Sequence, residues 1–176
     1  MQLLITLKGL ALGVLCALSF SLFILSIIYT NHQIVWGTGY SAGVVVLLVC
    51  ACLHWLYCTF LLASGRRGKM NSSRNLLGIH GFFTLWYFAM AVFLTAARYK
   101  EKYHTCPAGF VRENSTCGGM YKALMALTWS AFGILVIYLA HVFILAKKYS
   151  GLGAPDRDQL PLEEVEMRNV REKGGH

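Results

Sequence analysis

Three histidines in this 176-residue chain lie inside apolar segments, where an ionisable side chain is unusual. They are His54, His80 and His141. Neutral imidazole is a common ligand of metals and haem, so a cluster of these rings would support metal binding or redox chemistry. Each ring belongs to a different segment, however, and no Asp or Glu accompanies them there as a partner for a ligating ring. We therefore expect this polar cluster to make hydrogen bonds between helices. We expect no metal, no cofactor and no catalytic residue.

The six cysteines are the next candidates, and they divide into two groups. Four lie in the apolar segments, where a thiol behaves as a small apolar group: Cys16, Cys50, Cys52 and Cys58. Palmitoylation of Cys58, near a segment end, is the alternative. Cys106 and Cys117 lie outside these segments and flank a glycosylation sequence that begins at Asn114. On a lumenal face we expect a disulfide between Cys106 and Cys117 and a glycan on Asn114; the alternative is two reduced thiols in a cytosolic loop.

The elements that must position these residues are long apolar windows, which make up most of the chain: 9–29, 39–63, 75–97 and 121–146. Each reaches the length of about 20 residues that a helix needs to cross about 30 Å of hydrocarbon. None has Asp, Glu, Arg or Lys in its interior, since Lys122 stands at a boundary. The first window is longer than the apolar region of a signal peptide and lacks a cleavage motif. We predict an all-α, four-helix transmembrane domain over 1–148 and a flexible tail over 149–176.

The charges are distributed unevenly along the chain, whose formal net charge is +8. All eight Asp and Glu lie at or after Glu101, so the membrane part is basic and the tail is acidic. Lys and Arg near the membrane are about twice as numerous on the side that holds both termini and the loop 64–74. The positive-inside rule therefore predicts that both termini are cytosolic. That face would attract anionic inner-leaflet lipids, and we expect no nucleic acid partner.

The absence of carboxylates from the predicted spans argues against two functional classes, transporters and enzymes. Proton- and cation-coupled transporters use buried acids, and many carriers build their sites on interrupted helices. The three prolines, Pro107, Pro155 and Pro161, all lie outside the predicted spans. We assign no nucleophile elbow, and no HExxH, phosphate-loop or CxxC motif occurs in the sequence. We therefore expect a protein that is not an enzyme.

Small residues recur every four positions on the first two predicted helices. They are Gly9, Gly13, Ala17 and Ser21 on the first, and Gly39 and Gly43 on the second. Such stripes let helix backbones approach closely in lipid. We expect the first two helices to pack together through them, and a seam between two copies of the chain is the alternative.

The stretch 117–132 starts at Cys117, continues with Lys122-Ala123 and enters a fourth span that contains Trp129. This arrangement resembles the MARVEL domain as found in small fungal membrane proteins, with the four spans covering about 1–148. Claudins and tetraspanins fit less well, because the first outer loop is short and the CCG signature is absent. The resemblance implies a non-enzymatic role in organising membrane domains or vesicle trafficking, and it carries over no ligand-binding residue.

We therefore expect a multi-pass protein of the plasma membrane or the endomembrane system. Its partners would be membrane lipids and either other membrane proteins or a second copy of the chain. The alternative is a small channel or transporter subunit with a site at the intramembrane histidines. A histidine-ligated redox enzyme is a third hypothesis, and it predicts a visible absorption band.

Overall fold

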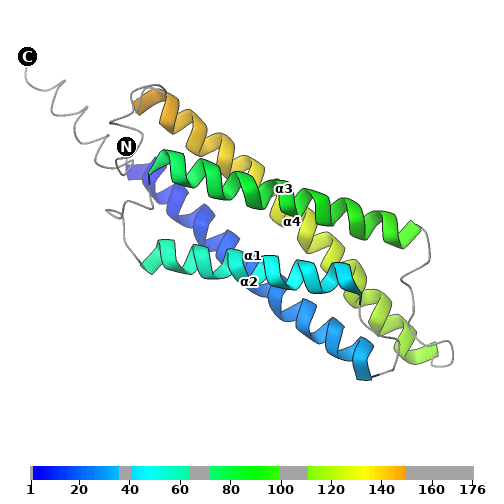
Figure 1. The fold of residues 1–176 in the computed structure, drawn as a ribbon. Helices are drawn as coiled ribbons and strands as arrows, with labels where there is room; N and C mark the ends of the chain where they lie inside the picture. Colours follow the sequence, from blue (N-terminus) through cyan, green and yellow to red (C-terminus); the bar gives the residue numbers. More distant parts are fainter. Residues whose placement is uncertain (1, 36–40, 64–71, 100–110, 150–176) are drawn as a thin grey trace, which may run out of the picture.

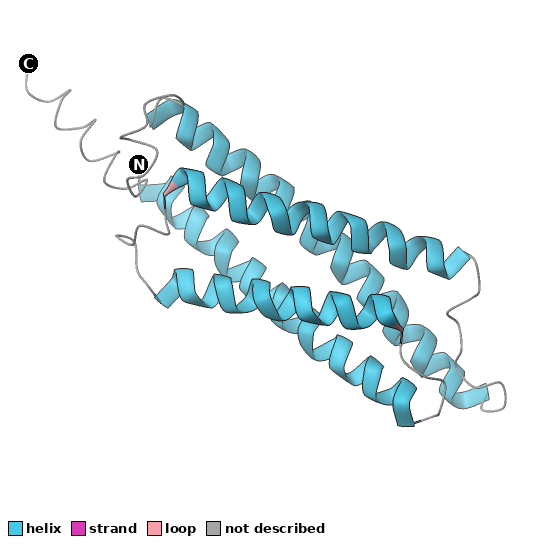
Figure 2. Cartoon of the chain, in the orientation of Figure 1, coloured by secondary structure: helices cyan, strands magenta, loops and turns pink. Residues whose placement is uncertain are grey.

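The computed structural model describes residues 2–35, 41–63, 72–99 and 111–149, and these residues form four α-helices and no strand. The helices are α1 (Gln2–Val35), α2 (Ala42–Ala63), α3 (Ser73–Tyr99) and α4 (Val111–Tyr149). Figures 1 and 2 show them side by side in one elongated bundle. The predicted all-α, four-helix architecture is confirmed.

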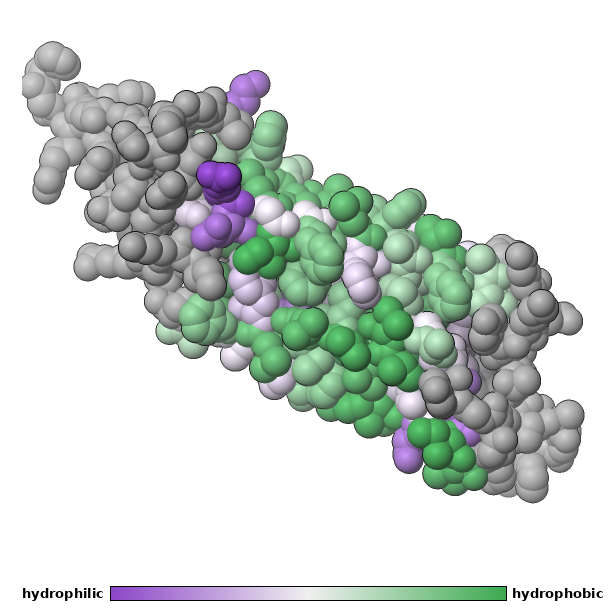
Figure 3. Space-filling model, in the orientation of Figure 1, coloured by the Kyte–Doolittle hydropathy of each residue, from purple (hydrophilic) through white to green (hydrophobic). Residues whose placement is uncertain are grey.

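All four helices are long and apolar enough to cross a membrane. The qualifying stretches are Gly9–Val35, Ala42–Ala63, Arg74–Ala97 and Gly118–Lys147. Large apolar side chains, mainly Leu, Ile, Val and Phe, also cover the outside of the bundle, as the green surface in Figure 3 shows. A water-soluble bundle would place polar groups there, so the outer surface is suited to lipid. The chain is therefore an integral, multi-pass membrane protein.

The first helix extends six residues beyond the window predicted from hydropathy, to Val35. The polar side chain of Gln33, near its end, makes local hydrogen bonds. The Gln33 Nε2 amide donates to the Tyr29 hydroxyl at 3.4 Å, and the Ser41 backbone N–H donates to Gln33 Oε1 at 3.1 Å. Gln33 thus joins the end of α1 to the residue before α2, which accounts for this buried amide inside the helix.

The helices pack as two antiparallel pairs. α1 lies against α2, α3 lies against α4, and α1 also contacts α4, whereas the contact between α2 and α3 is the sparsest of these. α1 begins and α4 ends at the same end of the bundle, where α2 also ends and α3 begins (Figure 1). We call this end the terminal end. Whether it faces the cytosol remains a prediction.

Several hydroxyl groups along the helices are satisfied within their own helix. The side chains of Thr84, Thr95, Thr128 and Ser130 each donate to the carbonyl four residues earlier, at 2.6–2.9 Å. This back-bonding lets a hydroxyl enter an apolar environment without a partner from another helix. Polar side chains that contact a different helix are therefore the informative ones, and several of them meet in one region.

Candidate functional site

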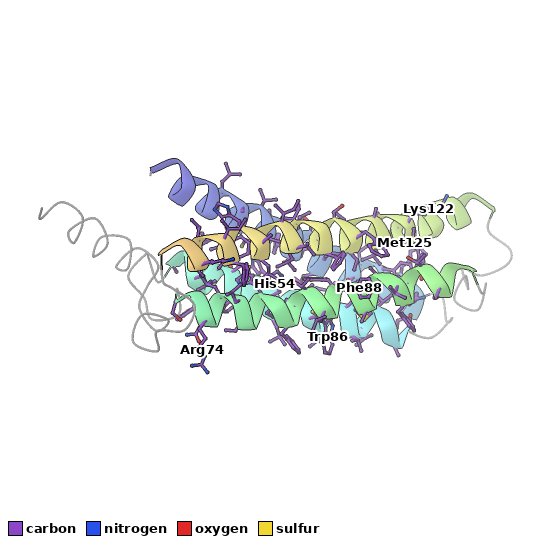
Figure 4. The ribbon with its side chains drawn as sticks, turned by 90° about the horizontal axis from the view of Figure 1, so that it is seen from above. His54, Arg74, Trp86, Phe88, Lys122 and Met125 are labelled. Carbon is purple, nitrogen blue, oxygen red and sulfur yellow. The ribbon has the colours of Figure 1, made fainter. Side chains whose placement is uncertain are left out.

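Two histidines and a cysteine meet in the interior of the bundle. His54 and Cys58 come from α2 and His80 comes from α3, and each is 0% exposed. One ligand atom from each of the three lies within 4.8 Å of the other two. His54 and Cys58 are one helical turn apart, so they share a face of α2. Figure 4 places His54 between the helices, in the half nearer the terminal end.

A backbone carbonyl fixes the tautomer of His80. Its Nδ1 lies 3.1 Å from the carbonyl oxygen of Leu76, one turn earlier on α3. A carbonyl oxygen can only accept, so Nδ1 carries the proton and donates it. In the neutral ring, Nε2 then presents its lone pair.

His54 is held from two other helices. Its Nδ1 lies 2.7 Å from Ser19 Oγ on α1 and 3.3 Å from the Tyr87 hydroxyl on α3. The Tyr87 hydroxyl also donates to Ser19 Oγ, at 3.5 Å. The Nε2 atom of His54 is buried and has no hydrogen-bond partner among the described residues. One ring nitrogen is thus anchored, and the other has unused bonding capacity.

Aromatic rings enclose the two imidazoles. The ring of Phe83 lies 4.4 Å from that of His54, and the rings of Tyr138 and Tyr57 lie 4.8 and 5.2 Å from that of His80, between centroids. The hydroxyls of Tyr57 and Tyr138 are buried without a hydrogen-bond partner among the described residues. Buried polar atoms without partners are costly in an apolar environment. The region therefore has more polar groups than its hydrogen bonds use.

The cluster lies off-centre along the bundle. At 1.5 Å per residue, Cys58 lies about 8 Å and His54 about 13 Å from the end of α2 at Ala63. Towards the opposite end the interior holds the buried hydroxyl side chains of Ser26 and Thr128 beside buried leucines from all four helices: Leu22, Leu47, Leu94, Leu124 and Leu135. The cluster therefore lies nearer the terminal end, and apolar side chains predominate in the interior beyond it among the described residues.

His141 takes no part in this group. It lies half-buried on α4, and its Nε2 has no hydrogen-bond partner among the described residues. The structure therefore brings together two of the three intramembrane histidines and adds Cys58 in place of the third. The sequence reasoning treated Cys58 as a small apolar group. The sequence feature that indicates its role is the four-residue spacing from His54 to Cys58 within one helix.

The small residues on α1 lie away from the interface with α2. Ala17 and Ser21 are exposed on the outer face, and nothing lies within 4 Å of a Cβ built at Gly9 or Gly13. α1 instead contacts α2 through other residues, including Ser19. The contacts of Cys16 with Thr59 and of Phe20 with Trp55 are further examples.

On α2, the small residue Gly43 does allow a close approach, although to a different helix. A Cβ added at Gly43 would collide with the ring of Phe93 on α3. Gly39 lies outside the described residues.

The predicted lumenal features fall largely outside the description. Cys106 lies in the undescribed segment 100–110. The backbone of Asn114 and Cys117 belongs to the first turns of α4, but their side chains are not described. The disulfide and the glycan therefore stay predictions, as does the tail, because 150–176 is also undescribed.

Residues 39–43 match the letters of the G-x-S-x-G motif of serine hydrolases, although the sequence analysis assigned no nucleophile elbow. That motif needs a strand before the serine and a helix after it. Ser41 does precede a helix, and its carbonyl accepts from the N–H groups of Val44 and Val45. No strand occurs among the described residues, and it is the backbone N–H of Ser41 that donates to Gln33 Oε1. The pattern therefore carries no catalytic argument.

Comparison of the chain with protein-family models, with curated proteins and with solved structures gave no match. The resemblance to the MARVEL domain thus has no family match in its support. The four-span architecture stands on the structure itself.

Proposed function

We propose that this protein is a non-enzymatic, MARVEL-like organiser of membrane domains or membrane traffic, with both termini in the cytosol. It works through the outer faces of its helices, which contact lipids and the helices of other membrane proteins or of a second copy. The plasma membrane or an endomembrane is its site of action.

The observation that supports this proposal is the outward position of the small residues on α1. The bundle does not use these small residues for its own packing: Gly9, Gly13, Ala17 and Ser21. Small residues at a spacing of four are a common contact surface between membrane helices, because they let backbones approach and gain van der Waals contact. An unused surface of this kind on a lipid-facing helix favours association with another helix.

The test is association between two differently tagged copies, and with other membrane proteins, at native expression in native lipid. Gly13→Leu would block close approach of a partner helix and is expected to reduce co-purification. Gly78→Leu on α3 is the matched control, since nothing lies within 4 Å of a Cβ at Gly78 either. If both variants co-purify with their partners as well as the wild type does, the small-residue surface of α1 is not the contact.

A small channel or transporter subunit is the second candidate, and the convergence of His54 and His80 in the bundle favours it. The buried leucines between this region and the opposite end argue against a continuous path. Flux in proteoliposomes that His54→Ala abolishes would favour this alternative over the organising role.

A further inference from the structure

We propose that His54, Cys58 and His80 form a binding site for one soft monovalent metal ion, Cu(I), held by two imidazole nitrogens and one thiolate. This inference goes beyond the organising role and does not depend on it. It replaces our sequence-based expectation that the histidines bind no metal.

The geometry needs little rearrangement to reach coordination. Bonds of about 2.0–2.3 Å from a metal to nitrogen and sulfur place the ligands of a trigonal site about 3.7 Å apart. The ligand atoms here already lie within 4.8 Å of one another. Small rotations of the three side chains would bring these atoms to bonding distance of one ion.

The surrounding contacts are those that orient metal-binding histidines. A ligating imidazole usually donates its second N–H to a carbonyl or another oxygen, which fixes its tautomer and direction. His80 does so to the Leu76 carbonyl, at 3.1 Å. For His54, Ser19 Oγ lies 2.7 Å from Nδ1 and is the matching acceptor. Its buried Nε2, which has no hydrogen-bond partner among the described residues, then supplies the bond to the metal.

The single negative charge that the ligands supply favours a monovalent ion. The site is fully buried, and no Asp or Glu occurs in any of the spanning stretches. A single thiolate neutralises Cu(I), whereas Zn(II) with the same ligands would keep one positive charge in a region of low dielectric. Thiolate and imidazole also suit Cu(I) by their softness.

Binding is an ion exchange without a change of oxidation state. Cu(I) takes the place of the proton on the Cys58 sulfur, the S–H bond breaks as the Cu–S bond forms, and the proton leaves to water. The net charge inside the membrane is unchanged. The metal would join α2 to α3, the neighbouring helices with the sparsest contact.

The experiment uses the full-length protein in nanodiscs, loaded with Cu(I) under ascorbate and challenged with the Cu(I) chelator bicinchoninate. The wild type is expected to retain about one Cu(I) more than the Cys58→Ala variant. X-ray absorption should report two nitrogen ligands and one sulfur ligand. Cu(I) should also raise the Tm of the wild type.

Cys52→Ala and His141→Ala are the matched controls, since each removes a residue of the same type outside the cluster. Both should retain Cu(I) as the wild type does. His80→Gln and Cys58→Ala should each lose it while keeping their apo helicity, which separates loss of a ligand from misfolding. Equal retention by Cys58→Ala, or retention of Zn(II) in preference to Cu(I), overturns the proposal.

Discussion

The imidazole ring of His80 meets that of His54 edge-on, with ring centroids 5.8 Å apart and an interplanar angle of 81°. The two rings come from α3 and α2, which otherwise contact each other least among the neighbouring helices. Their meeting therefore places two buried polar side chains at the seam where neighbouring helices have the sparsest contact. Contacts at this seam should affect stability and ligand binding together.

Ser19→Ala removes the hydroxyl that anchors His54 from α1 at 2.7 Å. The variant leaves a buried imidazole nitrogen with only the longer contact to Tyr87, so the free energy of unfolding should fall by about 0.5–2 kcal/mol. Unfolding in detergent titrated with SDS measures this change. Ser21→Ala is the control, because the Ser21 hydroxyl donates only to the Ala17 carbonyl of its own helix and is exposed. Equal losses in the two variants would contradict the anchoring role.

Hydropathy alone is sufficient to predict the four helices, because each has the length and composition of a membrane span. Hydropathy does not predict the rotation of each helix about its axis. When every face is apolar, no amphipathic pattern indicates which side turns inwards. This is why the small residues of α1 were expected against α2, whereas Gly9 and Gly13 have open space beside them.

The same limit applies to the candidate site. His54 and His80 could be placed in the same half of the membrane by counting from the helix ends. Whether they meet each other or His141 depends on helix rotation and neighbour order, which the sequence does not encode locally. Cys58 joins them because it follows His54 by four residues and so shares its face.

Gly43→Ala should destabilise the seam between α2 and α3, because the new methyl group would collide with the ring of Phe93. Phe93 is 39% exposed and can turn towards lipid, so we expect a modest loss of about 1–3 kcal/mol. The double variant Gly43→Ala/Phe93→Ala should recover part of that loss, which a double-mutant cycle measures. Additive effects would show that the two residues are not coupled.

Treatment with a glycosidase tests the predicted orientation. If both termini are cytosolic, only the sequence at Asn114 faces the lumen, and the acceptor at Asn71 stays bare. Asn114→Gln should therefore abolish the glycosidase-sensitive shift in mass, and Asn71→Gln should leave it unchanged. The reverse pattern would invert the topology.

Two tyrosines allow a matched test of buried hydroxyls. The Tyr121 hydroxyl donates to the Leu94 carbonyl at 2.7 Å, whereas the Tyr138 hydroxyl has no hydrogen-bond partner among the described residues. Tyr121→Phe should therefore lower the free energy of unfolding by about 1 kcal/mol, because it deletes a hydrogen bond between α4 and α3. Tyr138→Phe should be neutral or stabilising, because it removes a polar atom that is buried without compensation. SDS unfolding of both variants as metal-free protein measures the difference. A loss at Tyr138 as large as that at Tyr121 would mean that water or a bound ligand satisfies the Tyr138 hydroxyl.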